Sequence, residues 1–201
     1  MTENVRAAYS RRAAEYIELS GRIESADEVD RIRLAEWVGG LTGRILDVGC
    51  GPGQWTRFLH DAGADIAGLD PVPEFVDEAR RAHSGLEYRL GDARRLDEVD
   101  GGLGGILAWY SLIHMDPRQL DEALAEFGRC VRPGGGLAVG YFAGTVPTTF
   151  DHAVAPGRFW PPDLLAEHVD AAGFDVVDGD VRAASETRDL GRLFAVRRES
   201  D

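Results

Sequence analysis

The sequence contains no lysine, so all 22 of its basic residues are arginines. This leaves no lysine in the chain for Schiff-base chemistry. There are only two cysteines, Cys50 and Cys130, which is too few for a disulfide framework, and no other Cys or His lies at zinc-finger spacing. We therefore expect free thiols in a reducing compartment and no metal site.

The 35 acidic residues outnumber the 22 basic ones, which gives the chain a formal net charge of −13. A nucleic-acid backbone needs a positive protein surface, so we predict no nucleic-acid partner. No apolar run approaches the roughly 20 residues that cross a bilayer. The N-terminal residues MTENVRAAYSRR also lack the apolar core of a secretory signal. The sequence thus predicts a soluble, cytoplasmic protein that does not bind membranes.

The composition, 44% hydrophobic and 28% charged over 201 residues, is typical of a globular protein, and we predict one domain over residues 1–201. Two amphipathic helical segments come first, within residues 1–40. In the first, one helical face holds Val5, Tyr9, Ala13, Tyr16 and Ile17. In the second, the apolar stripe consists of Ala26, Val29, Ile32, Ala35 and Val38. Residues 25–28 predict a capping box at the start of the second segment.

From Arg44 onward, short apolar runs alternate with helical stretches, which is typical of βαβ units around a parallel sheet. The predicted strands are 44–48, 65–70, 86–90, 104–109, 136–142, 174–177 and 193–197. The predicted helices are 54–62, 74–83, 117–131 and 162–172, the third of which has Asp116 as its N-cap. We expect Gly179 and Asp180 to start the turn between the last two strands.

The strongest motif joins the first of these strands to the first helix after it. There a buried-strand pattern ends at Asp47 and runs into three alternating glycines, Gly49, Gly51 and Gly53. Such glycines let the backbone turn sharply and approach a ligand, and the next helix presents its N-terminal N–H groups. A dinucleotide fingerprint would need glycine at position 54, which is Gln54. The carboxylate of Asp47 would repel a pyrophosphate, but it suits a ligand with ammonium and sulfonium charges.

This D-x-G-x-G-x-G stretch resembles motif I of class I S-adenosylmethionine-dependent methyltransferases, and the likeness extends over about residues 44–139. Asp70 ends the second predicted strand, where an acidic residue accepts hydrogen bonds from ribose hydroxyls. Asp92 follows the third strand, where members of the family commonly bind the adenine amino group. Residues 132–136 match the R-P-G-G-x turn of the family. Taken singly, Asp70 and Asp92 could also be ordinary turn residues.

The resemblance implies an α/β, Rossmann-like fold with seven mostly parallel strands, helices on both faces and a helical lid over residues 1–40. It also implies S-adenosyl-L-methionine as the methyl donor and S-adenosyl-L-homocysteine as the product. The donor-binding residues that we predict are Tyr9, Tyr16, Asp47, Gly49, Cys50, Gly51, Gly53, Asp70, Pro71, Asp92, Ala93 and Tyr110.

Methyl transfer from an activated donor needs alignment and exclusion of water, and it needs a general base only if the acceptor must lose a proton. Residues 108–115, after the fourth strand, should lie beside the methyl group. They lack the D/N-P-P-Y/F box of related enzymes that methylate nucleic-acid bases, so we predict a small-molecule acceptor, as in the quinone and secondary-metabolite branch. His114 is the first candidate base, because the unperturbed pKa of histidine is near neutrality. A packing role for His114 is the alternative.

Two further segments are candidates for closing the site. Tyr9–Tyr16 resembles the Y-D-x-x-A-x-x-Y segment of this branch, although Ser10 replaces the Asp and Tyr16 comes one position late. Packing of these aromatic residues on the core is the alternative. The long connection 143–160 is a candidate acceptor loop that contains the second candidate base, His152.

Other functions stay open at this point, since the fold does not fix the reaction. A cyclisation or hydroxylation enzyme could keep the fold and the nucleoside without transferring a methyl group. A regulatory protein would have its crevice filled by its own side chains. An NAD-dependent oxidoreductase is a further alternative. We expect a monomer or a homodimer.

Overall fold

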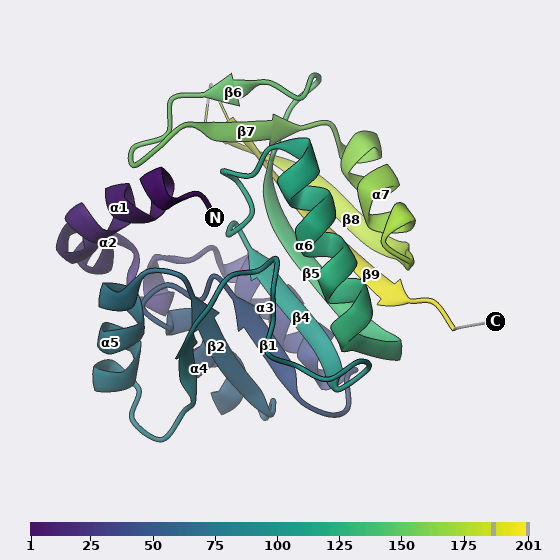
Figure 1. The fold of residues 1–201 in the computed structure, drawn as a ribbon, viewed down its shortest axis with the longest axis horizontal. Coiled ribbons are helices and arrows are strands. Elements are labelled where there is room, and N and C mark those ends of the chain that lie inside the picture. The colour runs from purple at the N-terminus through teal and green to yellow at the C-terminus, as the bar shows by residue number, and fades with distance from the viewer. Residues whose placement is uncertain (186–187, 200–201) are drawn as a thin grey trace.

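The computed structural model describes residues 1–185 and 188–199 of the chain. Five parallel strands form the centre of its sheet in the order β3-β2-β1-β4-β5 (Figure 1). In chain order they are β1 (Ile45–Val48), β2 (Ile66–Asp70), β3 (Tyr88–Leu90), β4 (Leu103–Trp109) and β5 (Val131–Ala143). The middle strands β1 and β4 are buried along their whole length. Their carboxyl ends therefore mark the edge of the sheet where ligands bind in folds of this kind.

Four more strands complete the sheet beside β5. β9 (Arg188–Arg197) runs antiparallel to β5, and β8 (Phe174–Ser185) runs antiparallel to β9 at the outer edge. β7 (Gly157–Trp160) pairs with the last residues of β5, beyond the end of β4, and β6 (Thr149–Phe150) pairs with β7. The described part of the chain thus has a nine-stranded sheet, whereas the sequence predicted seven strands.

The additional strand residues lie where the sequence shows no clear alternation of hydrophobic and polar residues. β6 and β7 lie inside the predicted connection 143–160 and are too short to show an alternating pattern. The predicted turn at Gly179 and Asp180 is wrong, because both residues lie inside β8, opposite Leu193 and Arg192. β8 is an edge strand with mostly exposed residues, so hydrophobicity does not mark its full length.

Helices cover both faces of the sheet, as predicted. α3 (Glu28–Gly39), α4 (Gln54–Asp61) and α5 (Pro73–Ala82) pack on one face, and α6 (Pro117–Cys130) and α7 (Pro162–Ala171) pack on the other. The predicted start of α6 is confirmed: Asp116 is its N-cap, and Asp116 and Gln119 form a reciprocal capping box. Among the described residues, no helix has the length and apolar character needed to cross a membrane.

The start and the buried face of α3 differ from the prediction. No capping box forms at residues 25–28; instead Asp27 is the N-cap and accepts a hydrogen bond from the backbone N–H of Val29. Val29 and Ile32 are 49% and 51% exposed. The buried face carries Asp30, whose carboxylate pairs with Arg192 of β9 at 2.9 Å. This ion pair fixes the rotation of α3, and a hydrophobic pattern gives no sign of it.

The two N-terminal helices lie beyond the carboxyl end of β2 and next to α5 (Figure 1). α1 (Glu3–Arg11) and α2 (Ala13–Ser20) are separated at Arg12, and η1 (Ile23–Ser25) leads on to α3. The predicted apolar face is confirmed, because all five of its residues belong to one cluster with Val72 and Phe75 at the start of α5. The helices therefore cover the edge of the sheet where β1 and β2 end.

Candidate functional site

The glycine loop between β1 and α4 has a backbone that side chains would disturb. Gly49, Gly51 and Gly53 all have positive φ, at +78°, +56° and +87°, a conformation that favours glycine. A Cβ on Gly49 would lie 2.2 Å from the Cβ of Ser111. A Cβ on Gly51 would meet only Tyr16, at 4.0 Å. Gly49 therefore allows close packing, whereas Gly51 faces open space beneath the N-terminal helices.

Two buried carboxylates flank this loop. Asp47, in β1, accepts a hydrogen bond from Thr56 Oγ1 at 2.7 Å. Asp70, at the end of β2, accepts from the backbone N–H groups of Gly51 at 2.9 Å and Val72 at 2.8 Å. Asp70 thereby holds the loop in place. Thr56 was not predicted, since a threonine in a helix gives no sign of its partner.

Burial raises the pKa of both acids. The pKa of Asp47 is raised to about 7, mainly by burial and further by the charge of Asp70. Burial raises the pKa of Asp70 to about 6. Neither acid forms an ion pair within residues 1–185 and 188–199. Two buried acids without a basic partner are an arrangement that a cationic ligand would stabilise.

Above the loop lies a hollow that we call the glycine hollow. It is lined by Tyr9, Tyr16, Gly49, Gly51, Asp70, Val72, Phe75, Trp109, Tyr110, Ser111, His114 and Met1. An apolar slot continues from it between the ends of β1 and β2, and it is lined by Val48, Leu69, Pro71, Ala93, Leu112 and Met115 among others. Lid, glycine loop and strand ends thus meet around one space, and Pro71 and Ala93 line its apolar end.

A larger opening, which we call the side cleft, adjoins the glycine hollow and has a volume of about 500 Å³. The two spaces share Tyr16, Gly49, Gly51, Trp109 and Tyr110 as lining residues. The near end of the side cleft is lined by Asp47, Cys50, Gln54 and Trp55, and the far end by residues of α2, η1, α3, β8 and β9. Trp109 and Tyr110 therefore stand at the junction of the two spaces.

Three predicted donor-binding residues have other surroundings than expected. Gly53 packs against Tyr88, since a Cβ there would lie 2.8 Å from the hydroxyl of that tyrosine. Cys50 has a buried thiol whose pKa is raised by burial, and it lines only the side cleft. Asp92 lines neither space and is hydrogen-bonded by Arg94 and by the amino group of Met1. Partial burial raises the pKa of Asp92, but the Arg94 hydrogen bonds outweigh it and hold this pKa well below its usual range.

His114 is held from two sides. Its Nδ1 lies 2.8 Å from the carbonyl oxygen of Pro156, and its Nε2 lies 2.8 Å from the hydroxyl of Tyr9. A carbonyl only accepts, so Nδ1 carries the proton and Nε2 accepts from the Tyr9 hydroxyl. Burial lowers the pKa of His114, which keeps the ring neutral near pH 7. The ring can therefore take up a proton only through Nε2, where Tyr9 is bound.

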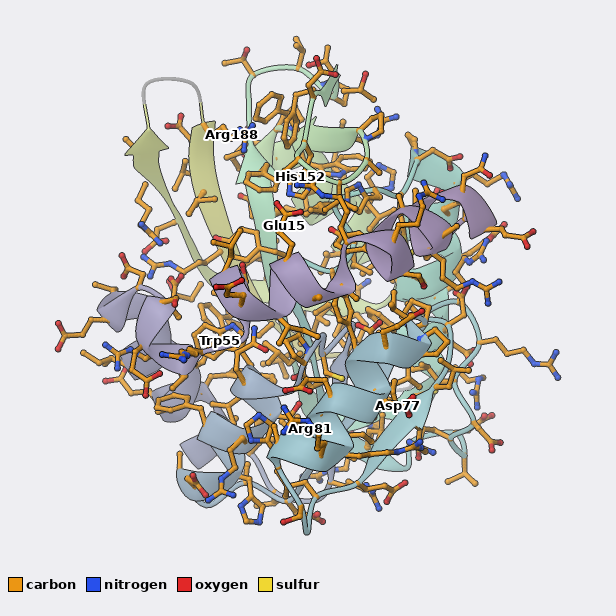
Figure 2. The ribbon with its side chains drawn as sticks, turned by 90° about the vertical axis from the view of Figure 1, so that its left-hand side faces the viewer. Glu15, Trp55, Asp77, Arg81, His152 and Arg188 are labelled. Atoms are coloured by element: carbon orange, nitrogen blue, oxygen red, sulfur yellow. The ribbon has the colours of Figure 1, made fainter. Side chains whose placement is uncertain are left out.

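The structure brings the second candidate base next to the first. The rings of His114 and His152 lie 5.3 Å apart between centroids, and only His114 lines the glycine hollow. Burial, His114 and the cations of Arg188 and Arg12 lower the pKa of His152 to about 4. Figure 2 shows His152 between Arg188 and Glu15 of α2. His152 thus supports His114 from the side of the 143–160 segment.

Aromatic side chains fill part of that segment, while residues 143–146, Thr148 and Phe159 line a separate opening of about 320 Å³ with Arg188 and Asp189. Phe150 packs against Phe159 with 4.3 Å between ring centroids, and against Phe142 at 5.0 Å. None of the residues 143–160 lines the glycine hollow or the side cleft. The segment forms a wall behind His114.

Tyr110 has an unusual backbone for its residue type. Among the described residues, it is the only non-glycine residue with positive φ, at +55°. Its N–H donates to the carbonyl of Gly140 at 3.0 Å, and its hydroxyl has no hydrogen-bond partner in the described chain. Backbone strain of this kind costs about 1–3 kcal/mol and is concentrated at functional sites. The sequence predicted Tyr110 as a site residue but gives no sign of this strain.

Known proteins with a similar sequence include methyltransferases. Residues 45–135 match the methyltransferase domain family. The malonyl-acyl-carrier protein O-methyltransferase of Pseudescherichia vulneris is 33% identical over 134 residues, which are 63% of this chain and 53% of that protein. The same enzyme of Salmonella typhimurium is 32% identical over 67% of this chain and 51% of its own length. The chain therefore spans about half the length of these curated relatives.

Solved structures share the fold over nearly the whole chain. The 4+2 cyclase SpnF has a TM-score of 0.81 at 19% identity, and the match covers 98% of this chain and 96% of that one. A Burkholderia thailandensis 1,6-didemethyltoxoflavin N1-methyltransferase, solved with its acceptor and S-adenosylhomocysteine, has a TM-score of 0.74 at 22% identity. That match covers 99% of this chain and 92% of the other. These likenesses establish the Rossmann-like fold.

Proposed function

We propose that the protein transfers a methyl group from S-adenosyl-L-methionine to a small-molecule acceptor, because residues 45–135 match the methyltransferase domain family and the chain has the fold of class I methyltransferases. The observation that carries this proposal is the pair of buried acids, Asp47 and Asp70, on either side of a glycine loop that leaves open space at Gly51. Such a site suits a nucleoside with a positively charged amino-acid tail.

The residues around the glycine hollow fit the parts of this donor. Pro71 and Ala93 line the apolar slot at the place of the adenine ring, and this slot, at about 20 Å³, has to widen to take the ring. Asp70 has a carboxylate at the hollow for the ribose hydroxyls, and Asp47, on the side cleft, suits the ammonium group. Tyr9 and Tyr16 of the lid close the hollow from above. When bound, the donor supplies an activated methyl group on a sulfonium, so positioning and exclusion of water are the main tasks of the protein.

Where the acceptor must lose a proton, Tyr9 and His114 are placed to remove it. Tyr9 reaches the glycine hollow and donates its hydroxyl hydrogen to Nε2 of His114. As the Tyr9 oxygen takes a proton from the acceptor, its own proton passes to Nε2, which leaves a neutral tyrosine and a histidinium. The carbonyl of Pro156 holds the other ring nitrogen and stabilises that cation. Tyr9, rather than His114, would then touch the acceptor.

The direct test is transfer of a labelled methyl group. Purified protein with methyl-labelled donor is incubated with two sets of acceptors: small conjugated metabolites, and malonyl groups on an acyl-carrier protein, as used by the relatives. We expect label in the small-molecule set, and loss of that label in Asp70→Ala. Label in the carrier-protein set alone would contradict the small-molecule acceptor. If label moves to neither set, methyl transfer itself is contradicted.

A non-methylating reaction on the same fold is the second candidate. The observation in its favour is the likeness to the 4+2 cyclase SpnF over 98% of the chain. Such an enzyme would bind the nucleoside and leave the methyl group on it. The two candidates differ in the labelled-methyl assay, because only the first forms S-adenosylhomocysteine.

A further inference from the structure

We infer that the methyl acceptor binds in the side cleft and is a planar conjugated molecule. Its reacting end lies at the junction with the glycine hollow, towards Tyr9, and an acidic group at the far end of the cleft pairs with Arg22. This inference rests on the proposed methyl transfer. It also moves the acceptor away from the 143–160 segment, where the sequence placed it.

The first reason is the position of the space. The side cleft meets the glycine hollow at Gly49, Gly51, Trp109 and Tyr110, so a molecule in the cleft reaches the place where the tail of the donor begins. On the other side of the hollow, the rings of the 143–160 segment pack against one another. The side cleft, at about 500 Å³, also has the size of a small-molecule site.

The second reason is the shape and chemistry of the walls. Trp55 and Trp109 pack edge to face with 6.1 Å between ring centroids, and Trp109 packs in the same way against Tyr110 at 5.5 Å. All three residues line the cleft, and Leu19, which is 68% exposed, stands at its rim. Aromatic walls of this kind bind flat conjugated molecules through apolar contact and ring stacking.

The third reason is the balance of charge at the far end. Each acid there already has a guanidinium partner: Arg182 pairs with Asp27 at 3.2 Å and Asp30 at 3.3 Å, and Arg192 pairs with Asp30 at 2.9 Å and Asp180 at 2.6 Å. Arg22 lines the same end, and none of the ion pairs within residues 1–185 and 188–199 includes it. One guanidinium therefore remains for a ligand, and a carboxylate or phenolate is its natural partner.

The occupant can be tested without knowing the natural acceptor. The probe is 1-anilinonaphthalene-8-sulfonate, an anion with a flat naphthalene ring, titrated by fluorescence into the full chain saturated with S-adenosylhomocysteine. The variants are Arg22→Gln, which removes the cation, and Leu19→Glu, which adds a negative charge at the rim. The matched control is Val146→Glu, the same type of change at a residue that is 53% exposed and lies in the 143–160 segment.

We expect the probe to bind the saturated protein, and each cleft variant to weaken that binding by about tenfold, equivalent to about 1.4 kcal/mol. Val146→Glu should leave the binding unchanged. Affinity for S-adenosylhomocysteine, measured separately by calorimetry, should stay the same in all three variants.

Three outcomes would overturn the inference. The probe could displace S-adenosylhomocysteine, which would show that the donor itself occupies the side cleft. Arg22→Gln could weaken the binding of S-adenosylhomocysteine as much as the binding of the probe, which would show that Arg22 binds the carboxylate of the donor. Probe binding could also be equally strong in Leu19→Glu and Val146→Glu. Failure of the wild-type protein to bind S-adenosylhomocysteine would instead contradict the proposed function, so the two failures are distinguishable.

Discussion

At the scale of single residues, the site depends on two buried acids: Asp70 holds the glycine loop, and Asp47 is buried without a basic partner in the described chain. The pKa of Asp47 is raised to about 7, from an ordinary value of 3.8. A group with a raised pKa in the folded state contributes stability at low pH and loses it as the pH rises through the folded pKa. Asp47 therefore destabilises the ligand-free protein progressively between about pH 4 and pH 7.

Asp47→Asn should separate stability from binding. The amide oxygen can still accept the Thr56 hydrogen bond, while the buried charge is gone. At pH 8 the melting temperature should rise by at least about 2 °C, since a gain of 1 kcal/mol shifts a chain of this length by roughly 2–4 °C. At pH 4, where Asp47 is already neutral, the two proteins should melt together and differ little in donor affinity, whereas at pH 8 the variant should bind the donor more weakly. Equal melting temperatures of the two proteins at pH 8 would show that the buried charge of Asp47 does not destabilise the fold.

The Tyr9–His114 contact predicts a specific protonation state. Long-range ¹⁵N–¹H spectra at pH 7 should show a protonated Nδ1 and an unprotonated Nε2 for His114. Protonation should begin only below the ordinary pKa of 6.5, because burial lowers the pKa of this ring. The transfer rate to an acceptor that must lose a proton should fall through the same range as the pH is lowered. Tyr9→Phe should raise the His114 midpoint, because the neutral ring loses its donor; an unprotonated Nδ1 would contradict the assignment.

Glycine substitutions test the packing of the loop. Gly49 and Gly63 both have positive φ, at +78° and +101°, but a Cβ on Gly63 would meet nothing within 4 Å. Gly63→Ala should therefore show the cost of backbone strain alone, about 1 kcal/mol. Gly49→Ala should cost more by about 1–3 kcal/mol, because its Cβ would collide with Ser111. Equal unfolding free energies in urea would mean that the Gly49–Ser111 contact is not tight.

At the scale of elements, α1 and α2 are the part of the site most open to change. They touch the rest of the chain through a small cluster around Tyr9, Val72 and Phe75, and through a few hydrogen bonds. These bonds join Tyr9 to His114, Ser10 to Glu74, and Arg12, between the two helices, to the carbonyl of Ala153. Elements held by few buried contacts open more easily than the central strands. A ligand in the glycine hollow would add contacts to Tyr9 and Tyr16.

Hydrogen exchange should show this coupling. With saturating S-adenosylhomocysteine, amide exchange in residues 3–20 should slow by about tenfold or more. The strands β8 and β9, which lie away from the glycine hollow, serve as the internal control and should change little. Equal slowing across both regions would indicate global stabilisation, and unchanged exchange in residues 3–20 would show that the lid is not part of the donor site.

The sequence was sufficient for elements that are defined locally. The five central strands and α4 to α6 were predicted, and residues such as Asp116 and Gly53 mark where helices start. The predicted start of the fifth strand at residue 136 is wrong, because β5 begins at Val131 and includes residues 132–136. The rotation of α3 could not be predicted, because it depends on the pairing of Asp30 with Arg192, 162 positions along the chain. The same holds for the site: the glycine loop is a continuous motif, whereas Tyr9 meets His114 across 105 positions.

At the scale of the whole molecule, charge and fold agree on the kind of ligand. The net charge of −13 favours the approach of cations, and the acids Asp47 and Asp70 stand where β1 and β2 end. Between them the glycine loop leaves its space open, and the lid covers it. The central claim is therefore that this space holds an amino-acid nucleoside of the S-adenosylmethionine type.

Calorimetric titration of S-adenosylhomocysteine into the wild-type chain, Asp47→Ala and Asp70→Ala tests this claim most directly. Circular dichroism of each variant provides the control for folding. We predict a dissociation constant in the micromolar range for the wild type, and a weakening of more than tenfold in each variant. No heat of binding in the wild type, or the same affinity in all three proteins, would contradict the claim.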